Sequence, residues 1–393
     1  MRILVSSYGS AGDLFPVIPL VQALIDDGHD VRCAVPRALG LYLRPHGLPV
    51  IGLGAGSELR ALSDRRLITA RFDGWDSWRR VADTYLADTV AADVALLERV
   101  MATWRPDLVV STTFAAAARV AACRSDLPRR EVTVSPQHLD RLPRAKAFAR
   151  HYRRAVARAL GSDGGAHEAD LVTALAWGAG ARTTLLHDRA LIADTADAGG
   201  ARGPAVGFPY WDAGPERPGD RAEVRAWLDR SSAPVVLVTL GSFLGIQPAG
   251  VRREATEAAR ALGLRVLLVG PQRDAVPEAG WAADDVLAVG FVRLSELVSR
   301  VAAVVHHGGI GTMFAALRAG RPAVVVPQAF DQAFNARSLA GVGAGVVGAE
   351  GSLREALAVA VGDASVARRA REVAEVLVPS GVATRRAVER VLA

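Results

Sequence analysis

Short apolar runs alternate along the first part of the chain with longer segments in which apolar residues recur at helical spacing. Four runs rich in Val, Ile and Leu predict strands: 3–6, 30–35, 107–111 and 131–135. The segment between the first two has apolar positions near a period of 3.6: Val17, Leu20, Val21, Leu24 and Ile25. Pro16 near its first turn and Gly28 at its end predict the limits of this helix. Strand, helix and strand in succession indicate a parallel sheet with helices on both faces.

The same pattern starts again after a region rich in Gly, Pro and charge. Four further apolar runs predict strands buried on both faces: 234–240, 265–269, 301–305 and 322–326. The C-terminal segment predicts two helices, separated near Pro379. We therefore expect an α/β protein of two Rossmann-like, doubly wound domains with a ligand crevice between them. The expected parts are an N-terminal domain at 1–205, a linker at 206–222, a C-terminal domain at 223–378 and a last helix at 379–393.

Composition narrows the class of protein. The chain has 393 residues, of which 50% are hydrophobic, so it can bury enough apolar surface for two domains. Cys33 and Cys123 lie far apart in apolar stretches, which fits a reducing compartment and excludes a cysteine-based zinc site. No apolar run reaches the ~18 residues of a membrane span, and the N-terminus lacks the apolar stretch of a signal peptide. We therefore expect a cytoplasmic protein.

The positive charge of the chain does not indicate nucleic-acid binding. The net charge is +6, but the arginines are spread along the chain and Lys146 is the only lysine. No segment resembles a basic arm or a known DNA- or RNA-binding motif. A mildly positive surface suits an anionic small molecule instead.

The loop Tyr8-Gly-Ser-Ala-Gly-Asp13 joins the first predicted strand to the first predicted helix. It is not the dinucleotide fingerprint, because the spacing is Gly9-x-x-Gly12 and no acidic residue follows the second strand. The two glycines permit a tight turn and close approach to a ligand. Asp13 has two interpretations: a cap of the helix N-terminus, or a general base at the carboxyl edge of the sheet.

The segment Val305-His-His-Gly-Gly-Ile-Gly-Thr312 ends an apolar strand and begins a helix. Its three glycines expose backbone N–H groups, and the helix N-terminus adds partial positive charge, which together suit a phosphate or diphosphate. Thr312 adds a hydroxyl donor, and a histidine beside the loop adds a hydrogen bond or a charge. The alternative is a tight turn with a histidine in the core. A zinc pair is disfavoured, because adjacent histidines on a strand point to opposite faces.

Residues after the next strand supply a carboxylate beside an amide. Asp331 and Gln332 suit paired hydrogen bonds to vicinal hydroxyls of a sugar; the alternative is that Asp331 caps the following helix. Four further pairs are weaker candidates, because each is equally explained as turn, surface or core residues. They are Gly241 and Ser242 for a phosphate, Phe291 and Val292 for a base, Asp284 and Asp285 for a divalent ion, and Gln137 and His138 for the lining of the crevice.

Taken together, these motifs resemble bacterial natural-product glycosyltransferases. The Gly9-Ser-Ala-Gly-Asp13 loop, the His307-Gly-Gly-Ile-Gly-Thr312 segment and the Phe330-Asp-Gln332 segment carry the resemblance, with Asn335 and the Gly341-Val-Gly343 that follow. The resemblance covers both halves of the chain and the spacing between them. Similar proteins form the inverting GT-B superfamily, family GT1, which includes the vancomycin-group and plant UDP-glycosyltransferases. The resemblance implies two Rossmann-like domains, a last helix crossing back to the first domain, and no metal or other cofactor.

The resemblance also implies roles for individual residues. Asp13 matches the catalytic base, and Ser10 helps to place the donor phosphate or the acceptor. The remaining matches are contacts to the donor. Phe291 and Val292 match contacts to the base, and Asp331 and Gln332 match contacts to sugar hydroxyls. The matches to the diphosphate contacts are His307, Gly308, Gly309, Gly311, Thr312, Gly241 and Ser242. One departure concerns the ribose: plant relatives carry a glutamate where this chain has Ala315. Uridine and thymidine donors therefore both remain open.

The expected activity is transfer of a sugar from a dTDP- or UDP-sugar to a small hydrophobic acceptor, with inversion and Asp13 as base. Trp75, Trp78 and Tyr85 are expected to shape the acceptor pocket, although ordinary packing explains these rings equally well. Two alternatives share the fold: a sugar-nucleotide epimerase and a non-catalytic activator of another enzyme. No nucleic-acid partner is expected, and the sequence leaves a homodimer open.

Overall fold

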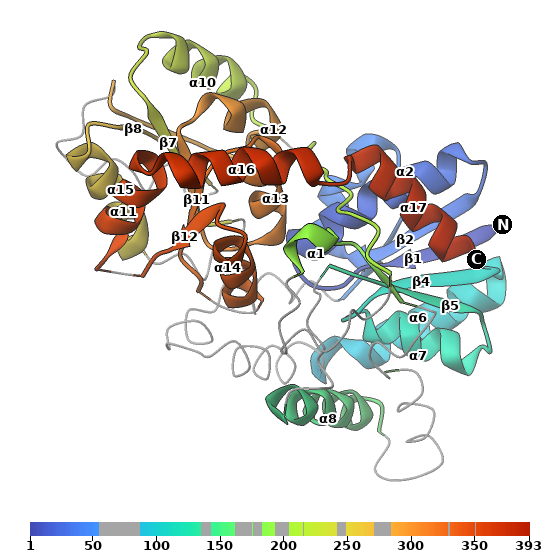
Figure 1. Ribbon diagram of the computed structural model, residues 1–393. Helices are drawn as coiled ribbons and strands as arrows, with labels where there is room; N and C mark the ends of the chain where they lie inside the picture. The colour runs from blue at the N-terminus through green and yellow to red at the C-terminus, as the bar shows by residue number, and fades with distance from the viewer. Residues whose placement is uncertain are drawn as a thin grey trace. The chain divides into compact units, whose positions relative to one another are not determined.

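The computed structural model of the 393-residue chain comprises two compact units. Unit 1 is Met1–Trp211 with Val378–Ala393, and unit 2 is Asp212–Leu377 (Figure 1). The described residues are 1–54, 87–134, 143–161, 175, 183–192, 204–214, 216–241, 249–270, 284–328, 331–349 and 351–393.

Unit 1 is built on a parallel sheet of six strands in the order β3-β2-β1-β4-β5-β6. Its strands are β1 (Arg2–Ser6), β2 (Asp30–Pro36), β3 (Val50–Leu53), β4 (Leu108–Thr112), β5 (Arg129–Thr133) and β6 (Thr183–Leu185). Its helices are α1 (Ala11–Leu14), α2 (Ile18–Asp26), α6 (Ala87–Trp104), α7 (Ala116–Arg124), α8 (Pro143–Ala159) and α17 (Ser380–Leu392). Short 3-10 turns lie at Phe15–Val17, Arg37–Tyr42, Arg44–His46 and Arg189–Leu191.

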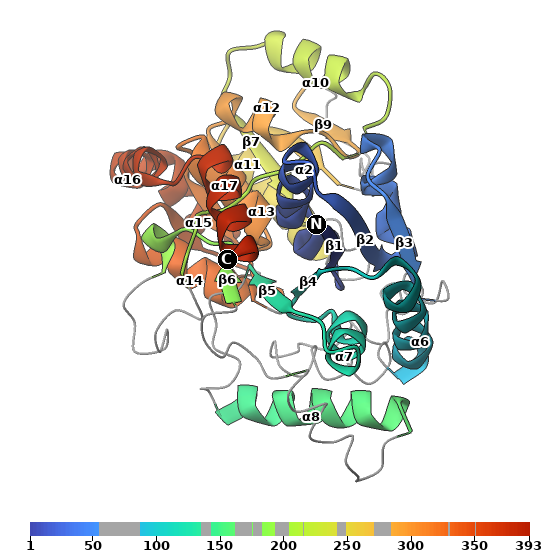
Figure 2. The same ribbon diagram turned by 90° about the vertical axis from the view of Figure 1, so that its right-hand side faces the viewer.

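Alternate side chains of these strands enter two separate cores. Ile3 and Val5 of β1 pack with α2 and α17, whereas Leu4 between them packs with α6 and α7. Figure 2 shows these two helix pairs on opposite faces of the sheet. An apolar run without polar alternation is therefore what this sheet requires, because every strand residue meets a helix layer.

Unit 2 repeats this plan with the strand order β12-β11-β10-β7-β8-β9, again parallel. Its strands are β7 (Val235–Thr239), β8 (Arg265–Val269), β9 (Val286–Val289), β10 (Ala303–His306), β11 (Ala323–Val325) and β12 (Gly345–Val347). Its helices are α10 (Asp220–Asp229), α11 (Ala249–Ala261), α12 (Leu294–Leu297), α13 (Ile310–Arg318), α14 (Gln332–Gly341), α15 (Leu353–Gly362) and α16 (Ala364–Val376), with a 3-10 turn at Val298–Arg300.

The C-terminal helix α17 belongs to unit 1 and lies beside α2, its distant neighbour in sequence (Figures 1 and 2). The backbone N–H of Val378 donates to Asp188 Oδ2 at 2.7 Å. The side-chain oxygen of Ser380 accepts from the N–H of Tyr210 at 2.7 Å and donates to the carbonyl of the same residue at 3.3 Å. The two places where the chain changes unit, after Trp211 and before Val378, are thus tied together within unit 1.

The expectation of two parallel Rossmann-like sheets is confirmed, and the eight predicted strands are present with ends shifted by at most a few residues. The sequence patterns did not predict four others: β3, β6, β9 and β12. Helix α10 begins at Asp220, within the stretch expected as linker. The rings expected at the acceptor pocket, Trp75, Trp78 and Tyr85, lie outside the described residues.

Candidate active site

Asp13 lies in the turn that follows β1, the strand at the centre of the unit 1 sheet. Ser10 caps helix α1, because its Oγ accepts from the N–H of Gly12 at 3.2 Å. Asp13 closes the reciprocal half of this capping box: its Oδ2 accepts from the N–H of Ser10 at 2.8 Å and from Ser10 Oγ at 3.0 Å. Asp13 is therefore part of a helix cap, at its third residue rather than at the cap position itself.

The helix cap uses Oδ2 of the Asp13 carboxylate and not Oδ1. Oδ2 of Asp13 accepts both hydrogen bonds from Ser10, and within the described part of the chain no other residue donates to Oδ1. The side chain is half-buried, and desolvation raises the pKa of Asp13, opposed by the hydrogen bonds from Ser10. A carboxylate held by one oxygen and accessible at the other, with a raised pKa, is suited to accept a proton.

The absence of a side chain at Gly9 leaves room for the Asp13 carboxylate. Its φ of +132° favours glycine, and a Cβ at this position would lie 2.4 Å from Asp13 Oδ2. The capping interpretation and the general-base interpretation of Asp13 are thus compatible, because the cap is what orients the carboxylate.

His307 lies at the carboxyl end of β10, which pairs with β7 at the centre of the unit 2 sheet and occupies the place that β4 has in unit 1. Its imidazole ring is enclosed by two glycine α-carbons: a Cβ on Gly309 would lie 2.4 Å from Nε2, and one on Gly241 would lie 2.6 Å from Cε1. Desolvation lowers the pKa of His307 to about 4, and a backbone hydrogen bond with Thr239 opposes that shift only in part. The ring is therefore neutral at neutral pH, and it can donate a hydrogen bond to a ligand but brings no charge.

Helix α13 begins directly after this histidine, and its N-terminus has no side-chain cap. The first N–H bonded inside the helix is that of Met313, to the carbonyl of Gly309 at 3.0 Å. The N–H groups of Ile310, Gly311 and Thr312 precede it and have no intrahelical acceptor. Space is open beside the α-carbon of Gly311 among the described residues. This end of α13 has the donors and the partial positive charge that an anion needs.

Gly308 differs from the expectation that all three glycines of the loop contact the diphosphate. It is buried, with a φ of +92°. Its N–H donates to His306 Nδ1 at 3.1 Å, and its carbonyl accepts from Asn335 Nδ2 at 2.8 Å. Both of its polar groups are engaged inside the protein, so Gly308 shapes the turn and has no N–H group left for an anion.

The carboxylate and amide after β11 lie at the same sheet edge as the glycine loop. Asp331 occupies the N-cap position of α14, but its side chain caps no backbone group; its Oδ2 accepts from Asn335 Nδ2 at 3.1 Å instead. Gln332 is 7% exposed, and its Oε1 accepts from the N–H of Gln328 at 2.7 Å. Asp331 is half-buried and is the more accessible of the two for a sugar hydroxyl.

The residues expected at the base lie farther along this edge. Phe291 and Val292 follow β9, three strands from β10, which corresponds to about 14 Å at the usual strand spacing. Val292 is 3% exposed, whereas Phe291 is half-buried, with its ring against the α-carbon of Gly214. Of this pair, Phe291 is the less buried. Ser242, Phe330, Gln137 and His138 lie outside the described residues.

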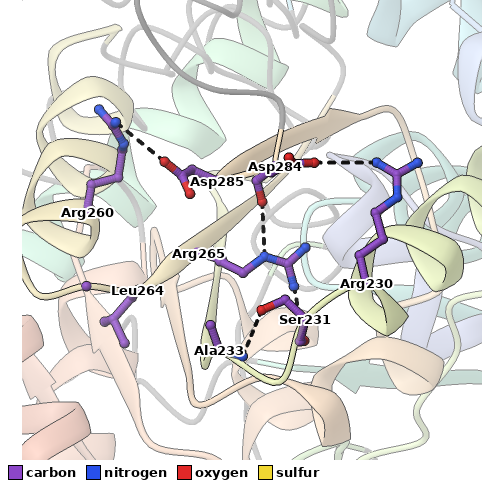
Figure 3. Close-up of a pocket in the computed structure, with 9 residues that line it drawn as sticks. Arg230, Ser231, Ala233, Arg260, Leu264, Arg265, Asp284 and Asp285 are labelled. Carbon is purple, nitrogen blue, oxygen red and sulfur yellow. Dashed lines mark hydrogen bonds and ion pairs between the residues drawn. The ribbon is translucent and has the colours of Figure 1, made fainter.

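Asp284 and Asp285, the weaker candidates for a divalent ion, line a pocket of about 510 Å³ at the opposite, amino-terminal edge of the unit 2 sheet (Figure 3). They pair with Arg230 at 3.8 Å and Arg260 at 3.6 Å. The buried Arg265 stacks over Trp227 at 3.7 Å and donates to backbone carbonyls at the end of α10. Each aspartate is thus paired with an arginine, and the pocket lies away from the sheet edge that carries the glycine loop.

The described residues contain no cluster of three His, Cys, Asp or Glu side chains able to hold a metal ion. In that same part of the chain, no helix combines the length and apolarity needed to cross a membrane.

Sequence reasoning missed two buried side chains that this geometry brings to the site. His306 was visible only as one of a histidine pair, and Asn335 only as part of a family motif. The signal that could have found Asn335 is its spacing of four from Asp331, which places both on one face of a helix.

Unit 1 contains another buried polar side chain, that of Asp93. It accepts a hydrogen bond from the N–H of Gly54 at 2.8 Å, and burial raises its pKa.

Comparison with known proteins bears on this arrangement of two Rossmann-like units and a glycine loop. Residues 266–385 match the model of the erythromycin biosynthesis protein CIII-like C-terminal domain. The dTDP-epi-vancosaminyltransferase of Amycolatopsis orientalis is 30% identical over 366 residues, which cover 88% of this chain and 85% of that protein. The elloramycin glycosyltransferase ElmGT of Streptomyces olivaceus is 30% identical over 405 residues, which cover 98% of this chain and 96% of that protein.

Solved structures show the same fold. The spinosyn rhamnosyltransferase SpnG, in complex with thymidine diphosphate, superimposes with a TM-score of 0.71 at 23% identity, covering 99% of this chain and 100% of that one. SnogD from Streptomyces nogalater gives 0.70 at 23% identity, covering 100% and 99%. The fold is that of GT-B glycosyltransferases. The chain belongs to the glycosyltransferases of antibiotic biosynthesis, family GT1, and it is an enzyme of the glycosyl-transferring class.

Proposed function

We propose that this glycosyltransferase moves a sugar from a dTDP- or UDP-sugar to a small hydrophobic natural-product acceptor, with inversion at the anomeric carbon. The observation that carries the proposal is the uncapped N-terminus of α13 beside a neutral His307. A dTDP-sugar is named for the relative from Amycolatopsis orientalis, and structures of SpnG hold thymidine diphosphate and a spinosyn aglycone. These ligands support the same classes of donor and acceptor here.

In the proposed reaction, Oδ1 of Asp13 takes the proton of an acceptor hydroxyl as its oxygen attacks the anomeric carbon. One carbon–oxygen bond forms, and the bond from the same carbon to the diphosphate breaks on the opposite side. The nucleoside diphosphate leaves with its added negative charge. Asp13 Oδ2 stays bonded to Ser10 throughout, so the base does not need to reorient.

The leaving group is stabilised by fixed dipoles in this proposal. The N–H groups of Ile310, Gly311 and Thr312 point from an uncapped helix end, and His307 adds a neutral donor. Preorganised donors of this kind act where charge develops, without a cost for reorienting them. Asp331 would hold sugar hydroxyls, and Phe291 would stack on the base. We propose that this set works without a metal ion.

The test is a thermal-shift panel with dTDP, UDP, GDP, ADP and NAD, followed by turnover of the purified chain alone. A ligand at ~100 times its dissociation constant adds about 2.7 kcal/mol to the unfolding free energy. We expect a shift with dTDP or UDP and none with NAD, and then release of that nucleotide only when an acceptor is present. Release of nucleotide with acceptor but no glycoside, or no shift with any nucleotide, would refute the proposal.

A further inference from the structure

Gly308 is the residue at which β10, the glycine loop and α14 meet. A Cβ at this position would lie 2.9 Å from the carbonyl oxygen of Gln332 and 3.0 Å from a methyl group of Val325. With a φ of +92° the residue also favours glycine for its backbone alone. The turn is therefore packed tightly against the element that carries Asp331.

Two buried side chains hold Gly308 from opposite sides. His306, with no exposed surface, accepts the Gly308 N–H at its Nδ1, and Asn335, 1% exposed, donates to the Gly308 carbonyl. His306 must be neutral with its proton on Nε2 to accept in this way. Burial keeps it so, lowering the pKa of His306 to about 3.

Asn335 makes a second contact from the same nitrogen. Its Nδ2 has two protons; one goes to the Gly308 carbonyl at 2.8 Å and the other to Asp331 Oδ2 at 3.1 Å. A single carboxamide thus links the glycine loop to the carboxylate expected to hold the sugar. The contacts of this side chain therefore bear on the distance between the glycine loop and Asp331.

We propose that His306 and Asn335 are positioning residues of the donor site, and that neither touches the donor. Together they fix the Gly308 turn, which orients His307 between its two flanking glycines and leaves the α13 N–H groups pointing outward. Asn335 in addition sets Asp331 at a fixed distance from that loop. This inference rests on the proposed donor site, and it concerns how the site is held rather than what it binds.

The contribution of His306 can be isolated with two substitutions. In His306→Asn, the amide oxygen takes the place of Nδ1 and can still accept from Gly308. His306→Leu has a similar volume and no acceptor, so it leaves the buried N–H of Gly308 unpaired. If the leucine variant does not fold, His306→Gln replaces it, because its oxygen reaches the place of Nε2 and not that of Nδ1.

The measurement is the ratio of two dissociation constants, that for the nucleoside divided by that for its diphosphate. The probes are thymidine with dTDP and uridine with UDP. We expect His306→Leu to lower this ratio about tenfold, the equivalent of one lost hydrogen bond of ~1.4 kcal/mol, and His306→Asn to restore most of it. A variant that is only partly folded loses affinity for both probes equally, so the ratio separates positioning from stability.

Asn335→Leu tests the second contact. We expect the same fall in the ratio, and in addition a loss of discrimination between donor sugars, because Asp331 loses its anchor. Ser338→Ala, a buried position on the same helix, is the matched control and should change neither quantity. If the unaltered chain binds diphosphate no better than nucleoside, the proposed donor site is wrong. If it does bind diphosphate better but His306→Leu and Asn335→Leu keep the full ratio, only the positioning inference is overturned.

Discussion

Each unit has a strand–turn–helix junction at the centre of its sheet, and the two junctions differ in how the helix begins. After β1, the first turn of α1 is closed by its own side chains, with Ser10 and Asp13 bonded reciprocally. After β10, helix α13 begins at Ile310, and its N-cap residue Gly309 provides no side-chain cap. The backbone plan is the same, but the first helix end carries a carboxylate of the chain and the second leaves its N–H groups unpaired.

This difference shows how one local plan can serve two kinds of chemistry. A capped helix end has fewer donors left for an anion, and the capping carboxylate is held in one orientation and can act as a base. An uncapped end has no anionic group of its own, so a diphosphate can take that place. The comparison predicts that substitutions at the first junction remove the base, whereas substitutions at the second weaken the stabilisation of a diphosphate.

The largest effect is expected from Asp13→Asn. The amide oxygen can still accept from Ser10, so the helix cap and the melting temperature should be kept while the base is lost. Loss of a general base typically lowers the rate by ~10²–10⁴-fold. Turnover and nucleotide affinity measured on the same preparation check this, and turnover close to that of the unaltered chain would remove Asp13 from the role of base.

Gly309→Ala tests the uncapped junction through His307. The φ of Gly309 is −63°, so alanine brings no backbone strain, but its Cβ would lie 2.4 Å from His307 Nε2. We expect the ring to be displaced and kcat/KM to fall by about 10²-fold, as for other lost transition-state donors. Gly341→Ala is the matched control, because no atom of the described residues lies near its added Cβ. Equal activity of the two variants would contradict the assigned position of His307.

Gly311→Ala should separate stability from binding. Alanine in the first turn of α13 has space within the described residues and a helix propensity better than that of glycine by about 1 kcal/mol. The melting temperature should rise. If a diphosphate lies against this helix end, the added methyl group should also weaken its binding by about tenfold, roughly 1.4 kcal/mol. A more stable variant with unchanged dTDP and UDP affinity would place the diphosphate elsewhere.

Ser10→Ala is expected to have the smallest effect, which is a shift in the pH dependence of kcat/KM. Asp13 acts as a base only when deprotonated, so activity falls as the pH drops through its pKa, which burial has raised. The hydrogen bonds from Ser10 lower that pKa. Removing the hydroxyl should raise it further and move the acidic limb of kcat/KM to higher pH, with about 1 kcal/mol lost from the helix cap.

Ser7→Ala is the control for this shift, because Ser7 Oγ donates to the backbone carbonyl of Asp13 at 3.3 Å and not to its carboxylate. An acidic limb that moves equally in both variants, or in neither, would show that Ser10 does not tune the base.

The central strands of both sheets could be predicted from the sequence, and the edges could not. The four strands that the apolar runs did not predict are the edge strands β3, β6, β9 and β12, each of three or four residues. A central strand packs against helices and strands on every side, so its sequence must be continuously apolar. Thr183–Leu185 shows the difference, because this edge strand has three residues, two of them threonines, and so contains no apolar run.

The candidate site, too, could be predicted from the sequence only in part. The positions of Asp13, His307 and Asp331 at strand ends follow from local sequence, because parallel strands end at a common edge. The engagement of Gly308 does not, since it depends on His306 and on Asn335, which lies 27 positions away and is brought close only by tertiary packing. The glycine spacing predicts that all three glycines of the loop contact the ligand, whereas in the structure Gly308 forms a tightly packed turn.

The Ser380–Tyr210 pairing has a consequence for building hybrid enzymes from this protein. A single cut after Trp211, with everything downstream taken from a relative, would import a foreign α17 onto the native unit 1. Ala387, Val388 and Val391 of α17 belong to a core of unit 1, and Arg385 pairs with Asp27 there. An exchange of unit 2 alone therefore needs two junctions, at 211/212 and 377/378, so that the last helix stays with the unit it helps to fold.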